Sequence, residues 1–161
     1  MDFVFCVGDK VVYPMYGAGT IIDLEEKMID GASHSYYVLS IPVGNLKILV
    51  SVKNAESAGI RSIIDSNRLI SIIDDVKNVP VMMHENWNQR YKENMEKIKT
   101  GNIGLVAEVF RNLRVREREK GLSSAEKKVL STAKQIILSE IILSHEVERP
   151  QAEDILDTVI C

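Results

Sequence analysis

The sequence predicts an α+β protein in which a small N-terminal β-barrel precedes a compact α-helical bundle. The chain has 161 residues, 45% of them apolar and 27% charged, which is typical of a soluble globular protein with one domain or two small ones. Before about residue 60, apolar residues alternate with polar ones or are interrupted by tight turns, and after it they recur with helical spacing. We therefore expect two domains, at residues 1–60 and 61–161.

The first domain is predicted to consist of short strands joined by tight turns. Asp30-Gly31 is a strong hairpin signal between two strand-like segments. In the last strand Lys47 and Leu49 alternate with apolar residues, so both side chains are expected to face away from the core. This density of strands and turns favours an SH3-like or Tudor-like barrel, with strands expected at 10–13, 20–29, 34–41 and 47–52.

The second domain is predicted to contain helices with recognisable first and last residues. Asn86 and Asn102 are expected N-caps, and a glycine ends each helix that they open. Ser123 and Glu126 have the spacing of a capping box, which would start a long helix reaching about Ser144. The expected helices begin near residues 66, 87, 103, 124 and 150.

Charge is distributed unevenly along the chain. The net charge is −3, yet residues 87–134 hold 12 Lys or Arg and 6 Asp or Glu, a local charge of +6. Such a basic block attracts phosphates, because each neutralised phosphate releases counterions. The alternative is a solvated helix face on which Arg111, Arg114 and Arg118 pair with glutamates one turn away.

No motif for catalysis or metal binding is present in the sequence. The three histidines are far apart and lack metal-ligand spacing, and no nucleophile elbow occurs. We therefore expect no enzyme, metal, cofactor or small-molecule substrate, with a small hydrolase built around His34 as a competing interpretation. Two cysteines near opposite ends favour the reducing cytosol, and no apolar segment is long enough to span a membrane.

Trp87, the single tryptophan, has two possible roles. It shares a predicted helix face with Tyr91 and Met95, so one interpretation packs it in the helical core and makes the protein an adaptor that binds only proteins. In the other, the ring is exposed at the positive end of its helix, beside Arg90 and Lys92. There it would stack on, or insert beside, an unpaired base.

Several segments carry family motifs. Residues 7–17 match V-G-D-x-V-V-Y-P-x-x-G, and residues 86–94 match N-W-x-x-R-Y-K-x-N. Residues 106–109 are V-A-E-V, and residues 121–127 match G-L-S-x-x-E-K. Together with 152–157, these segments resemble CarD-type bacterial transcription regulators over nearly the whole chain. The first motif is shared with transcription-repair coupling factors.

The resemblance implies a Tudor-like domain that binds the β subunit of RNA polymerase. It also implies a helical domain that contacts promoter DNA at the upstream edge of the transcription bubble. Trp87 would wedge into the minor groove there and prolong the life of the open complex. Arg90 and Lys92 match family residues that hold phosphates, and the basic block suggests further phosphate contacts at Arg114, Arg116, Lys127 and Lys128.

The resemblance implies that the polymerase-binding surface includes Lys27, Lys47 and Leu49. The family often carries an arginine where Leu49 stands, whereas Lys27 retains a basic group. An exposed leucine would serve an apolar contact, and the edge of the barrel would be available to pair with a polymerase strand.

Overall fold

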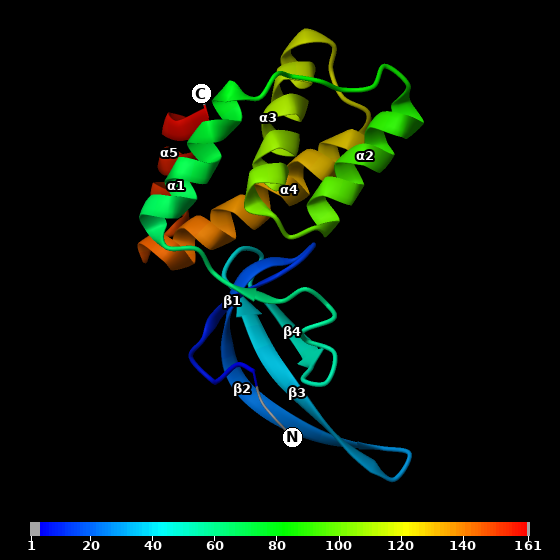
Figure 1. Ribbon diagram of the computed structural model, residues 1–161, viewed down its shortest axis with the longest axis vertical. Coiled ribbons are helices and arrows are strands. Elements are labelled where there is room, and N and C mark those ends of the chain that lie inside the picture. Colours follow the sequence, from blue (N-terminus) through cyan, green and yellow to red (C-terminus); the bar gives the residue numbers. More distant parts are fainter. Residues whose placement is uncertain (1–3, 161) are drawn as a thin grey trace.

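The computed structural model describes residues 4–160, which form an antiparallel sheet followed by a group of helices (Figure 1). The strands are β1 (Lys10–Tyr13), β2 (Gly17–Ile29), β3 (Ala32–Ile41), β4 (Leu46–Ser51) and β5 (Arg61–Ser62). The helices are α1 (Ser66–Asp75), the 3₁₀ turn η1 (Val76–Asn78), α2 (Trp87–Lys99), α3 (Ile103–Glu119), α4 (Ser124–His145) and α5 (Arg149–Ile160). The predicted α+β class is confirmed.

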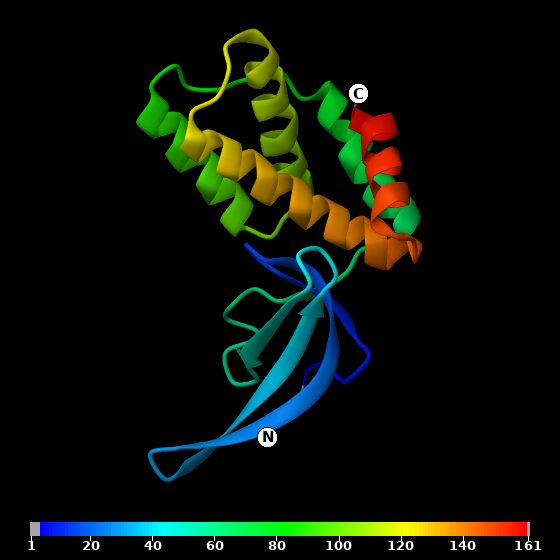
Figure 2. The ribbon, with the colours of Figure 1, turned by 180° about the vertical axis from the view of Figure 1, so that it is seen from behind.

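The sheet is open, so the predicted closed barrel does not form. Its order is β4-β3-β2-β1-β5, and within residues 4–160 the two edge strands do not pair with each other. β5 has only two residues, and β2 and β3 continue beyond β4 as a two-stranded arm, which projects from the sheet in Figure 2. The arm turns at Asp30 and Gly31, whose positive φ angles confirm the hairpin prediction.

Side-chain caps start the helices of the second part. The Asn86 side chain accepts a hydrogen bond from the Gln89 N–H, and the Asn102 side chain accepts one from the Leu105 N–H, each at 3.2 Å. Ser123 caps α4. These contacts confirm the predicted starts of α2, α3 and α4, because each satisfies a backbone donor that the helix itself cannot pair.

The helical core is built mainly from α3 and α4, and two side chains of the sheet region join it. Phe110 and Leu113 on α3 pack with Ile137 on α4, all fully buried, and Val43 and Met15 from the turns of the sheet pack against this cluster. The sheet has a second, separate core around Tyr37. β5 lies just past residue 60, and the domain division at that residue stays a prediction.

Candidate nucleic-acid and polymerase interfaces

Trp87 lies at the surface, in the first turn of α2, and 44% of it is exposed. Its ring stacks on Tyr91, with the ring centroids 5.8 Å apart and the planes 18° from parallel. The indole Nε1 donates a hydrogen bond to Ser123 Oγ at 3.2 Å. The interpretation that places Trp87 in the helical core is therefore wrong. The ring is held by a neighbour and a hydrogen bond but remains open to solvent.

The bond between Trp87 and Ser123 brings the first turns of α2 and α4 together. Ser123 is the N-cap of α4, and Trp87 is the first residue of α2. Helix N-termini carry partial positive charge and backbone N–H groups without intrahelical partners, and both properties favour a nearby anion. The exposed indole is therefore next to two electropositive helix ends.

Three lysines lie in the second turns of these helices: Lys92 on α2, and Lys127 and Lys128 on α4. All three are exposed, and within residues 4–160 no carboxylate lies within 4.0 Å of their ammonium groups. Lys128 and Tyr91 also line a groove of about 360 Å³ between α2 and α4. We call Trp87, Tyr91 and the three lysines the indole surface.

Arg90, expected to hold phosphates, is buried instead, with 3% of it exposed. Its guanidinium donates to both carboxylate oxygens of Glu126, at 2.8 and 2.9 Å, and to the carbonyl oxygens of His84 and Glu85. The hydrogen bond from Arg90 lowers the pKa of the Glu126 carboxyl, against the opposing effect of burial. Because Arg90 is engaged and enclosed, it supports the start of α2 from inside and does not face a ligand.

Arg116 and Arg114 face different neighbours of α3. Arg116 Nε lies 4.0 Å from Glu126 Oε2, and its side chain is 21% exposed, so it adjoins the helix start that carries the indole surface. Arg114 lies over the Phe110 ring and 3.5 Å from Asp157 on α5. The structure therefore groups Arg116, but not Arg114, with the indole surface.

The basic block is not neutralised by the ion pairs that the alternative interpretation needs. Glu108 pairs with Lys97 on α2 at 2.9 Å rather than with an arginine of its own helix. Within the described residues 4–160, neither Arg111 nor Arg118 has a carboxylate within 4.0 Å. Arg111 donates instead to the Val76 carbonyl at 2.7 Å. Two of the four arginines of α3, Arg111 and Arg118, therefore have no ion-pair partner in the described part of the chain.

Lys27, Lys47 and Leu49 share the outer face of the sheet. Their partners on β3 are even-numbered residues, which alternate with the core residues Tyr37 and Leu39. All three predicted residues are exposed, Leu49 by 42%. The outer face therefore presents an apolar side chain on the edge strand β4, with basic side chains on the same face.

Two family models match the chain, one described as CarD-like/TRCF RID domain over residues 5–64 and one as CarD, C-terminal domain over residues 71–157. A protein of Bacillus subtilis (strain 168) named "Putative transcription factor YdeB" is 37% identical over 138 residues, which cover 86% of this chain and 90% of that protein. The chain belongs to the CarD-like family of transcription factors.

Membership confirms the resemblance and the expectation of a non-enzymatic protein. The N-terminal part of this CarD-like protein is an RNA polymerase-interacting domain. Within residues 4–160, no group of three His, Cys, Asp or Glu side chains is arranged to hold a metal ion. In the same residues, no helix combines the length and apolar character needed to cross a membrane.

Sequence reasoning found the cap of α4 in this CarD-like chain but missed its connections to α2. Ser123 Oγ accepts hydrogen bonds from the Glu126 N–H and from Trp87, so one hydroxyl both caps α4 and holds the indole. The Glu126 carboxylate accepts two hydrogen bonds from the Arg90 guanidinium. Both contacts span 36 residues, a separation that capping rules do not address.

Proposed function

We propose that this CarD-like protein binds the β subunit of RNA polymerase through the outer face of its sheet and stabilises the promoter open complex with its indole surface. Trp87 contacts the upstream edge of the transcription bubble, and Lys92, Lys127 and Lys128 contact phosphates. The half-exposed indole between two helix N-termini is the observation that carries this proposal.

A single ring is sufficient for a measurable effect on the open complex. Stacking on one base contributes about 1–3 kcal/mol, and about 1.4 kcal/mol changes an equilibrium tenfold. Trp87 needs no chemistry to act, because an occupied bubble edge recloses more slowly than an empty one. The lysines give attraction without base readout, so the response of a promoter should follow bubble stability more than sequence.

The polymerase contact is supported by the outer face and the free edge of the sheet. Leu49 is an exposed apolar side chain on β4, and β4 has a partner strand on one side only. A strand of the β subunit would pair with this edge through backbone hydrogen bonds while Leu49 fills an apolar contact. Lys27 and Lys47 lie on the same face and supply charge at its rim.

Replacing Trp87 by alanine tests the DNA contact. Trp87→Ala should leave the affinity for a polymerase β fragment unchanged and shorten the lifetime of open complexes about fivefold or more. The lifetime is measured by promoter retention after a heparin challenge.

Met28→Ala is the control, because Met28 is a large apolar side chain exposed by 70% on the arm of β2, away from both the indole surface and the contact between the sheet and α4. An unchanged lifetime with Trp87→Ala, at full polymerase binding, would refute the wedge.

A further inference from the structure

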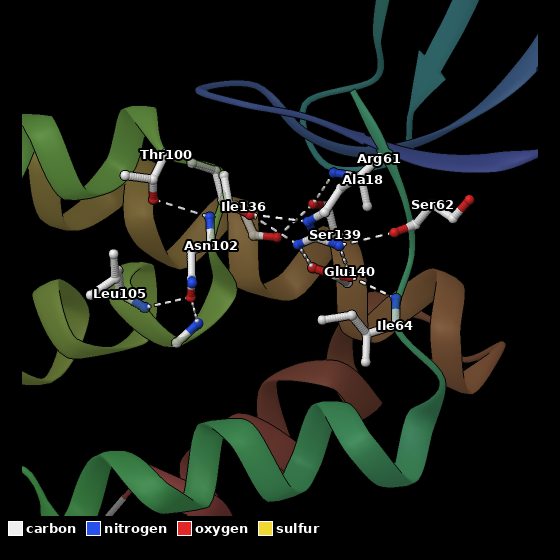
Figure 3. Close-up of polar contacts among 12 residues, drawn as sticks. Ala18, Arg61, Ser62, Ile64, Thr100, Asn102, Leu105, Ile136, Ser139 and Glu140 are labelled. Atoms are coloured by element: carbon white, nitrogen blue, oxygen red, sulfur yellow. Dashed lines mark hydrogen bonds and ion pairs between the residues drawn. The ribbon is translucent and has the colours of Figure 1, made fainter. Parts of the chain in front are cut away.

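We propose that Glu140 is a positioning residue that fixes the angle between the polymerase-binding sheet and the helix that carries Trp87. The inference rests on the proposed function, because it explains how a sheet bound to the polymerase holds Trp87 at a fixed position relative to the bubble edge. It concerns the junction, which we define as Ala18, Arg61, Ile64, Gly101, Ser139 and Glu140. Figure 3 labels all of these residues except Gly101.

Glu140 is fully buried where α4 meets the sheet. Its two carboxylate oxygens accept hydrogen bonds from the Arg61 guanidinium at 2.8 and 2.9 Å, and one of them also accepts from the Ile64 N–H at 3.0 Å. Arg61 donates in addition to the carbonyl oxygen of Gly101, in the turn that follows α2. One carboxylate therefore connects α4 with β5, with the segment that leads into α1 and with the end of α2.

Close backbone approach restricts the same junction. Ser139 Oγ accepts a hydrogen bond from the Ala18 N–H at 2.8 Å, and a Cβ on Gly17 would lie 2.6 Å from that oxygen. Gly17 also has a φ of +110°, which side chains rarely adopt. The start of β2 therefore fits against α4 in one position and cannot slide along it without a clash.

The polar contacts, more than the apolar ones, set the angle. Val43 and Met15 pack from the sheet region against the helical core, but apolar contact is non-directional and permits sliding. Hydrogen bonds to a buried carboxylate have preferred distances and directions. A buried ion pair adds little net stability compared with apolar packing, yet it can select one arrangement among several.

The position of Trp87 makes this angle important. The end of α2 lies at the junction through Gly101, and Trp87 lies at the opposite end of the helix. At 1.5 Å per residue, α2 is about 20 Å long, so a tilt of about 20° at the junction would move the indole by about 7 Å. Such a shift exceeds the separation of stacked rings and would take Trp87 out of register with the bubble edge.

Glu140→Gln tests the inference, because it removes the charge while keeping the size of the side chain. In a Cys6→Ser/Cys161→Ser background, spin labels at Lys53→Cys and Glu96→Cys report the distance between sheet and α2. We expect a broader distance distribution and an open-complex lifetime shortened about threefold or more, while the affinity for a polymerase β fragment stays within about twofold. If Glu140 only stabilised the fold, its substitution would not broaden the distance and shorten the lifetime while leaving the polymerase affinity intact.

Glu153→Gln is the matched control, because it removes a carboxylate that pairs with Lys134 on α4 at 3.8 Å, away from the junction. Arg61→Lys provides a second test if Glu140→Gln does not fold, since it keeps the charge and loses the two-pronged contact. An unchanged distance distribution, or a broadened one with the original lifetime, overturns the inference. If Trp87→Ala leaves the lifetime unchanged, the proposed function fails, and the width of the distance distribution still decides the role of Glu140.

Discussion

The two helix starts that carry the exposed indole of Trp87 also contain a buried ion pair. Arg90 and Glu126 are each about as buried as apolar core residues, and they join the first turns of α2 and α4. A buried pair of this kind is tolerated because two charge-assisted hydrogen bonds compensate the loss of water. If one partner loses its charge, the other is left uncompensated in the interior.

We predict that Glu126→Gln destabilises the protein by about 3 kcal/mol, because it leaves the Arg90 guanidinium buried without a counter-charge. Urea unfolding followed by circular dichroism measures the change. The matched control is Glu93→Gln, which breaks an exposed contact with His84 and should cost about 0–1 kcal/mol. Equal effects of the two substitutions would contradict the structural role of Glu126.

The same carboxyl predicts an acid-sensitive stability. The pKa of Glu126 is lowered in the folded protein, so its contribution is complete at neutral pH and is lost as the pH falls through the ordinary glutamate range toward the lowered value. We therefore expect the stability difference between the native protein and Glu126→Gln to shrink on acidification. Urea titrations from neutral to acid pH measure it, and a constant difference would argue against this linkage.

Among the elements, β4 has the most direct role in the proposed polymerase contact. Its strand is short, it forms one edge of the sheet, and its side chains alternate between the core and the outer face. A strand from another protein can pair with an edge of this kind, since the backbone donors and acceptors of the edge strand face outward.

We predict that Leu49→Asp weakens binding of a polymerase β fragment about tenfold, because a carboxylate would replace the apolar contact. Isothermal titration calorimetry measures the affinity. Leu46→Asp is a matched control on the same strand: Leu46 is 44% exposed, but its β3 partner is the core residue Ile41, so it belongs to the opposite face. A larger loss with Leu46→Asp would assign the polymerase contact to that face.

At the scale of the whole molecule, positive and negative charges are concentrated in different parts of the chain, although the net charge is small. The chain has a net charge of −3, while residues 87–134 alone carry +6. The folded protein places part of this charge on the indole surface, where within residues 4–160 no carboxylate pairs with Lys92, Lys127 or Lys128. This unpaired positive charge lies on the surface that we propose contacts DNA, whereas the chain as a whole is acidic.

We predict that Lys127→Gln/Lys128→Gln lowers the salt dependence of DNA binding, with the slope of log K against log salt falling by about 2. Fluorescence anisotropy on forked promoter DNA at several salt concentrations measures the slope. Lys53→Gln/Lys77→Gln removes the same charge away from the indole surface and should leave the slope unchanged. Equal slopes for all three proteins would show that these two lysines do not contact phosphates.

The sequence by itself determined the features that depend on neighbours within a few residues. The four predicted strands, the Asp30-Gly31 hairpin and the caps at Asn86, Asn102 and Ser123 follow from backbone preference and local hydrogen bonding, and they form within a few residues of where expected. The two-residue strand β5 was not predicted, because it forms only by pairing with the distant β1. The family motifs also identified Trp87 as a candidate, because its residue type and helix position are local properties.

Only the tertiary structure decided which of these side chains is available to a partner. Burial of Arg90 against Glu126, exposure of Trp87 beside Ser123 and enclosure of Glu140 by Arg61 each depend on residues 36 to 79 positions away. The open edge at β4 likewise depends on where the distant β5 pairs. Solvent exposure and the choice of counter-ion are set by packing between residues far apart in the sequence. No local sequence pattern therefore specifies which distant residue a side chain will contact.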